Sequence, residues 1–144
     1  MPRNDTAELL GAIRENAEMG RITIRELLSV TKDAEFSAAL EPRLREYNDI
    51  LQQAGKQIEG IHARVKGAGA VSKVSANVMV HVAALADKSP AAMAQMLVDG
   101  LTEGVADMRA KRRTYGQADE EALRLADRLL RFERQSLREM RRYV

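Results

Sequence analysis

One carboxylate of the sequence falls where a charged group needs a partner. Glu133 lies near the centre of an apolar arc in the last expected helix, formed by Ala122, Ala126, Leu129, Leu137 and Met140. A carboxylate removed from water is costly unless it is paired or protonated. Three partners are open to it: an Arg or Lys, the hydroxyl of Tyr47, or a group on a partner chain. We predict that Glu133 has a polar partner within the bundle or across an interface, and we favour a structural role for it over a functional one.

The same helix carries a row of arginines opposite the apolar arc, namely Arg124, Arg128, Arg131, Arg138 and Arg142. Such a row is suited to contact the phosphates of nucleic acid or an anionic lipid surface. However, Glu120 precedes Arg124 by four residues and Asp127 precedes Arg131 by four, which favours ion pairs along the helix. No aromatic residues interleave with the arginines to stack on bases. We therefore favour a solvated, ion-paired face, and nucleic-acid binding is not expected.

The composition is that of a globular protein with a helical core. The chain has 144 residues, of which 45% are hydrophobic and 31% charged, and it fits one domain covering residues 1–144. Its 23 cations nearly balance 21 anions, which argues against a dedicated nucleic-acid binder. The absence of cysteine excludes disulfides, thiol catalysis and Cys-ligated metals. No signal peptide or membrane span is recognisable, so we expect a cytoplasmic protein.

Apolar residues recur every three or four positions and predict helices throughout. The first helix should begin at Asp5, with Asp5 as its cap, and end near Thr31; its seam is Leu10, Ile13, Ala17, Gly20, Ile24 and Leu27. The second should continue to about Lys66, and Pro42 within it predicts a kink or a short helix followed by a long one. Its seam is Phe36, Leu40, Leu44, Tyr47, Leu51, Ala54, Ile58, Ile61 and Val65.

The third helix is expected to be broken. Its first part covers about residues 71–86, and Ser89-Pro90 starts a second part that continues to about Thr114. A last helix should begin near Asp119 and continue to the C-terminus. Short loops make sequence neighbours antiparallel. The sequence therefore predicts an all-α protein, an antiparallel up-down four-helix bundle with a broken third helix and no strands.

Three phrases resemble the ferritin-like superfamily, particularly its small bacterial four-helix members. They are Asn16-Ala17-Glu18-Met19-Gly20, the interruption Ala86-Asp87-Lys88-Ser89-Pro90, and Met96-Leu97-Val98-Asp99-Gly100. Metal-binding members of that superfamily place a Glu on each of two helices and Glu-x-x-His on the other two. The resemblance thus implies a ferritin-like bundle and raises the question of a site for two Fe or Mn ions.

The ligand pattern that the resemblance implies is degenerate in this chain. The sequence has one Glu-x-x-His, Glu59 to His62, and it lies about 20 Å along the bundle from Glu18 and faces away from the seam. An acidic ridge formed by Asp99, Glu103 and Asp107 also faces outward. The remaining metal candidates are Glu18, Glu46, Asp49, Glu103 and Glu133, and of these Glu133 alone lies on an apolar stripe. We therefore expect no cofactor, with Fe or Mn as the alternative.

These observations leave several functions open. We favour a non-catalytic helical scaffold or protein-interaction domain; the alternatives are a dinuclear metal-binding protein or oxidoreductase, and a weak nucleic-acid or anionic-surface binder. A second apolar stripe on the first helix, formed by Ala12, Met19, Ile22 and Val30, predicts a homo-oligomer, most simply a dimer.

Overall fold

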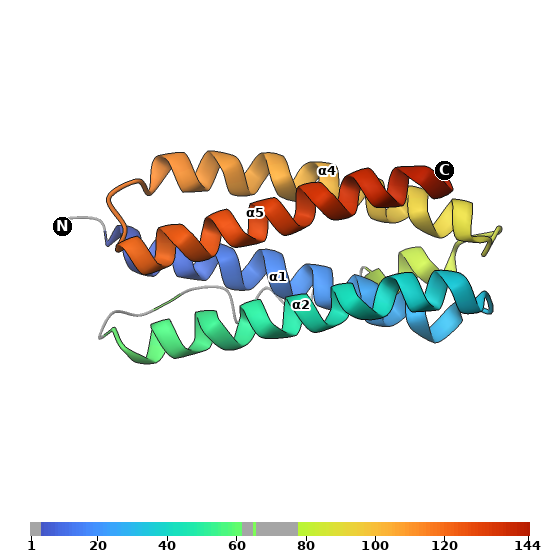
Figure 1. Ribbon diagram of the computed structural model, residues 1–144, viewed down its shortest axis with the longest axis horizontal. Coiled ribbons are helices and arrows are strands. Elements are labelled where there is room, and N and C mark those ends of the chain that lie inside the picture. The colour runs from blue at the N-terminus through green and yellow to red at the C-terminus, as the bar shows by residue number, and fades with distance from the viewer. Residues whose placement is uncertain (1–3, 62–64, 66–77) are drawn as a thin grey trace.

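The computed structural model describes residues 4–61, 65 and 78–144, and this part of the chain is helical without strands (Figure 1). Four long helices, α1 (Asp5–Val30), α2 (Ala34–Glu59), α4 (Pro90–Thr114) and α5 (Glu120–Met140), lie along one another, and the 3₁₀ turn η1 (Arg141–Tyr143) follows α5. Residues 78–83 are also helical, which agrees with part of the expected 71–86 helix; residues 71–77 lie outside the described part. No described helix combines the length and apolarity needed to cross a bilayer.

The helix starts follow from their capping residues. Ser89 caps α4 through its side chain, which accepts from Ala92 N at 3.2 Å, and Pro90 is the first helical residue, as predicted. The predicted cap of α1 is wrong by one position. Asn4 is the cap and accepts from Ala7 N at 3.0 Å, whereas the carboxylate of Asp5 accepts from Gln117 N at 3.1 Å. Asp5 therefore ties the start of α1 to the loop between α4 and α5.

Helix α2 is one continuous helix that contains Pro42, so of the two predicted alternatives the division into a short and a long helix is wrong. It also ends earlier than predicted. Gly60 is its C-cap, and the Gly60 N–H donates to Gln57 O at 3.2 Å, a short-range bond that closes the last turn. The expected seam residue Ile61 thus lies just beyond the helix, although it still packs against the core.

The directions of the helices differ from simple alternation. In Figure 1, α1 is antiparallel to α2 and α4 is antiparallel to α5, as expected for helices joined by short loops. Helices α2 and α4, in contrast, point the same way, so the end of α2 and the start of α4 lie at opposite ends of the bundle. The prediction that all sequence neighbours are antiparallel is therefore wrong at this one connection.

One apolar core runs between the four helices. Its fully buried side chains include Leu9 and Ile13 of α1, Phe36 and Ile50 of α2, and Leu129 of α5, together with Leu10, Ile24, Leu27, Leu40, Met93, Met108 and Met140. The expected seams supply most of these residues. Leu9 and Ile50 are additions, because the buried arc of each helix is wider than a single stripe. Near the middle of this core lies a group of polar side chains.

Candidate functional site

The centre of the polar group is Glu133 on α5, whose side chain is buried in the bundle with a relative exposure of 3%. Its neighbours on the same face of α5 are Leu129, Leu130 and Ser136, all buried. The hydroxyl of Tyr47, from α2, donates to Glu133 Oε2 at 2.7 Å. The prediction that Glu133 has a polar partner within the bundle is confirmed, and the partner is the tyrosine among the three alternatives.

A glycine on α1 makes room for this tyrosine. A Cβ atom built on Gly20 would lie 2.2 Å from Tyr47 Cζ and 2.6 Å from the Tyr47 hydroxyl oxygen. The ring of Phe132 packs edge-on against the Tyr47 ring, with centroids 4.9 Å apart and an interplanar angle of 79°. Gly20 and Phe132 therefore fix the ring in the position from which its hydroxyl reaches Glu133.

The other two helices complete the group through Asn16 of α1 and Gly104 of α4. Asn16 Nδ2 donates to Gly104 O at 3.2 Å, which orients the amide. A Cβ on Gly104 would lie 3.9 Å from both carboxylate oxygens of Glu133, so the acid lies directly beneath this glycine. Two buried acceptors, Glu133 Oε1 and Asn16 Oδ1, have no hydrogen-bond partner among the described residues. We call Asn16, Tyr47, Gly104 and Glu133 the four-helix polar cluster, because each helix contributes one member.

Burial controls the protonation of this cluster. Burial raises the pKa of Glu133 to about 7, although the Tyr47 hydroxyl and the nearby Asn16 side chain act to lower it. Burial also raises the pKa of Tyr47 well above its ordinary value, and the adjacent Glu133 carboxylate raises it further. Glu133 thus changes protonation near neutral pH, so it is able to hold a proton or to bind a cation.

A cavity of about 60 Å³ adjoins the cluster, and Asn16, Gly20, Gly100, Gly104 and Glu133 are among the residues that line it. It shares Asn16, Met19, Gly100 and Gly104 with a groove of about 330 Å³ between α1 and α4. The two spaces therefore adjoin along the glycine face of α4.

The groove, which we call the α1–α4 groove, contains part of the second apolar stripe of the first helix. Ala12 and Ile22 are almost fully buried along it, whereas Met19 is 47% exposed. Its polar lining comprises Asn16, three acids and one cation, namely Glu15, Glu103, Asp107 and Lys111. Val30, the fourth member of the predicted stripe, packs against the core instead.

A larger hollow of about 590 Å³ lies between α2 and α5 near Gly60. Part of its polar lining is already engaged: Gln57 Nε2 donates to Glu121 O at 3.3 Å, and Arg124 pairs with Glu120 at 3.2 Å. In contrast to the cavity beside Glu133, it offers no buried acceptor without a partner among the described residues. We therefore take the four-helix polar cluster and the α1–α4 groove as the candidate site.

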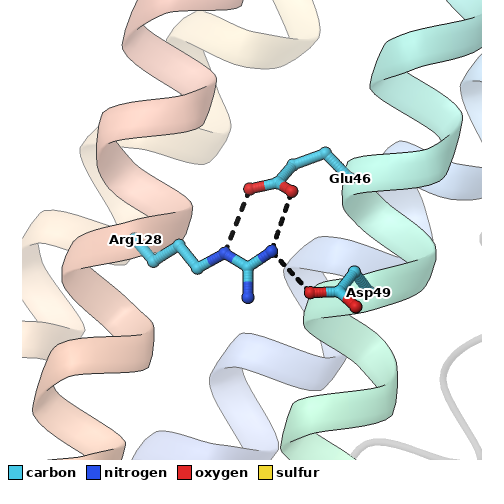
Figure 2. Close-up of polar contacts among 3 residues, drawn as sticks. All are labelled: Glu46, Asp49 and Arg128. Carbon is cyan, nitrogen blue, oxygen red and sulfur yellow. Dashed lines mark hydrogen bonds and ion pairs between the residues drawn. The ribbon is translucent and has the colours of Figure 1, made fainter.

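Two of the metal candidates are held by an arginine. Glu46 and Asp49 lie one turn apart on α2, and the Arg128 guanidinium of α5 reaches both (Figure 2). Arg128 donates to the two oxygens of Glu46 at 3.1 and 2.8 Å and to Asp49 Oδ2 at 2.6 Å. The hydrogen bond to Glu46 raises the pKa of Arg128 above its ordinary value. These carboxylates therefore act as an anchor between α2 and α5.

We expect Arg128→Gln to lower the free energy of unfolding by about 1 kcal/mol in dilute buffer, because it leaves two carboxylates close together without their cation. The loss should shrink in about 1 M salt, which screens this half-exposed group. Urea unfolding at both salt concentrations measures the effect. Arg124→Gln is the matched control, since its pair with Glu120 is largely exposed, and an equal loss in both variants would contradict the assigned role.

The other three metal candidates lie at separate places in the bundle, away from Glu46 and Asp49. Glu18 pairs with Arg21 on its own helix, with Arg21 Nε 2.8 Å from Glu18 Oε1, and Glu103 lines the α1–α4 groove. Glu133 is the one candidate in the core. Within the described residues, no three acidic or histidine side chains are grouped so as to hold a metal ion. His62 lies outside the described part of the chain.

The arginine row divides into paired and exposed members. Arg124 and Arg128 form the ion pairs given above, and the expected pair of Glu120 with Arg124 is confirmed. The expected pair of Asp127 with Arg131 is wrong, because Asp127 instead accepts from Arg112 of α4 at 3.0 Å. The three remaining members are exposed, namely Arg131, Arg138 and Arg142.

Sequence reasoning did not single out the half-buried Asn16 or the buried Arg43. Asn16 lies three residues after Ile13 and four before Gly20, a spacing that places it on the edge of the α1 seam. Arg43, 9% exposed, lies three residues after Leu40 and four before Tyr47, and it pairs with Glu139 of α5. In both cases the three-and-four spacing was the available signal.

Comparison with protein-family models, with curated proteins and with solved structures finds no match to this chain.

Proposed function

We propose that this chain is a non-catalytic, ferritin-like helical bundle that serves as a protein-interaction domain, and that the α1–α4 groove binds a basic amphipathic helix. The long connection between α2 and α4 supports the ferritin-like part, because one long crossover is typical of that bundle topology. The interaction part rests on one observation, the exposed Met19 in an apolar groove that has acidic side chains on its border.

The dimensions of the groove suit a helix. From Ala12 to Ile22 its α1 wall extends about 15 Å at a rise of ~1.5 Å per residue, the length of about three helical turns. An amphipathic helix binds such a groove with apolar side chains spaced three and four residues apart. Methionine adapts its shape to different apolar partners, which makes Met19 suitable for this contact.

The charges on the border select a basic partner. Glu15, Glu103 and Asp107 outnumber Lys111, which itself pairs with Asp107 at 3.1 Å. A basic helix would place its cations opposite these acids. A second copy docked by the same face about a two-fold axis would instead bring two sets of these acids together. The groove therefore fits a basic partner better than a symmetric dimer, and any homodimer should use another face.

The test uses a labelled amphipathic peptide about four turns long, with leucines on one face and lysines on the other, and measures binding by fluorescence anisotropy. Wild-type protein should bind it saturably and should bind the version with glutamates in place of lysines at least about tenfold more weakly. Met19→Lys should weaken binding of the lysine peptide by about tenfold or more, since it removes apolar contact and adds a like charge.

Met79→Lys is the matched control, because Met79 is 52% exposed and does not line the groove. It should bind the lysine peptide as wild type does. Equal binding of the two peptides, or equal weakening by both substitutions, would overturn the proposal. A second copy of the chain is the other candidate occupant of the groove, and analytical sedimentation tests it. If wild type is a dimer and Met19→Lys is a monomer, the groove serves self-association instead.

A further inference from the structure

The cavity next to the four-helix polar cluster has the chemistry of a cation site. Glu133 Oε1 and Asn16 Oδ1 are both buried, and neither meets a donor with good hydrogen-bond geometry among the described residues, although the Asn16 amide lies close enough to Glu133 to lower its pKa. The other polar atom of each side chain already forms a hydrogen bond. Glu133 Oε2 accepts from the Tyr47 hydroxyl, and Asn16 Nδ2 donates to Gly104 O. A protonated Glu133 carries a hydrogen of its own, but when Glu133 is ionised both atoms are acceptors that can take a further donor.

The size of the cavity limits that donor to a small group. A volume of about 60 Å³ has room for a few water molecules, or for one ammonium group with its first carbon. Above the pKa of Glu133, water would satisfy the hydrogen bonds but would leave the carboxylate charge without a counterion in the core. An ammonium group supplies three N–H donors and a full positive charge.

The surroundings also provide a place for the rest of a ligand. The cavity adjoins the α1–α4 groove, whose walls include the apolar side chains of Ala12, Met19 and Ile22. Gly100 and Gly104 of α4 line both spaces, and a Cβ on Gly100 would meet no atom within 4 Å. A chain of several methylenes thus has space to pass from the acid to the groove.

We propose that the cavity binds the primary ammonium group of an alkylamine, with N–H donors to Glu133 Oε1 and Asn16 Oδ1 and the apolar tail in the α1–α4 groove. An ammonium group of this kind can come from two sources, namely a free amine or the side chain of a lysine in a bound protein. This site does not depend on the proposed function, because a free amine needs no partner helix.

The test is a titration of ¹⁵N-labelled protein with n-butylamine hydrochloride at about pH 8.5, where the amine remains protonated and Glu133 is ionised. We expect saturable shifts of the Asn16 side-chain amide and the Gly104 backbone amide. n-Butanol, a neutral molecule of similar shape, should give none. A parallel titration with Nα-acetyl-lysine amide distinguishes the sources: binding of the lysine derivative admits a protein ligand, and binding of butylamine alone restricts the site to free amines.

Glu133→Gln should abolish the saturable shifts, because it removes the charge and places an amide donor beside Asn16 Oδ1. Glu41→Gln is the matched control, since Glu41 is exposed on α2 and lines neither the cavity nor the groove, and it should bind butylamine within about twofold of wild type. Thermal unfolding checks that both variants fold. Shifts that persist in Glu133→Gln, equal shifts with butanol, or no saturable shift with either amine would overturn the site, whatever the peptide experiment shows.

Discussion

Gly20→Ala is expected to lower the free energy of unfolding by about 2–6 kcal/mol. The new methyl would lie 2.2–2.6 Å from the Tyr47 ring and hydroxyl, so the buried ring has to move. Overpacking of a core typically costs about 1–3 kcal/mol, and separating a buried acid from its hydrogen-bond donor costs about 1–3 kcal/mol more. Urea unfolding followed by circular dichroism measures the loss, and the tyrosine absorbance should report a changed environment for the ring.

Gly55→Ala provides the comparison for this substitution. Gly55 lies within α2, and a Cβ there would meet no atom within 4 Å. Replacing glycine by alanine in such a helical position should stabilise the protein by up to about 1 kcal/mol. If Gly20→Ala proved as harmless as Gly55→Ala, the close approach of Tyr47 to α1 would not exist in solution.

Glu133→Gln is expected to stabilise the protein at high pH and to have little effect at low pH. In the folded protein burial raises the pKa of Glu133 from 4.5 to about 7. Between these values the unfolded chain has released the proton that the folded chain retains, so wild-type stability falls as the pH rises and becomes constant above about 7. The difference of about 2.5 pH units corresponds to about 3 kcal/mol.

The amide introduced by this substitution has no such titration. We expect its oxygen to accept from Tyr47 as the carboxylate does, and its NH₂ takes the place of Glu133 Oε1, the acceptor that has no donor in the wild-type protein. Urea unfolding of wild type and variant at intervals from about pH 4.5 to pH 8.5 measures the difference. A difference that does not change over this range would show that Glu133 is not buried as a titrating acid. Glu103→Gln, at an exposed position of α4, should follow wild type throughout.

The burial of Glu133 was predictable because it depends on one helix. The apolar arc of α5 is regular, and an acid at its centre has to enter the core. Tyr47 was among the expected partners because it lies on the seam of α2. The pairing of Asn16 with Gly104 was not predictable, because it depends on which helix lies beside α1 and at what height, and the residues are 88 positions apart.

The same limit explains the wrong ion pair and the wrong helix direction. Spacing along α5 indicates that Asp127 is within reach of Arg131, but it does not reveal that α4 brings Arg112 closer. Likewise, apolar periodicity sets where α2 and α4 form but not how the chain travels between them. Local rules thus fix the helices and their buried faces, whereas contacts between helices depend on a topology that no single segment encodes.

The contribution of one cluster residue from each helix has a consequence for how the chain folds. Helices α1 and α2 form one hairpin and α4 and α5 form another, each from residues near in sequence. Tyr47 belongs to the first hairpin and Glu133 to the second, 86 positions away. Local pairings form early, and such distant contacts form after them. Neither hairpin alone therefore encloses Glu133. The carboxyl group loses its water of hydration only in the folding step in which the two hairpins pack together.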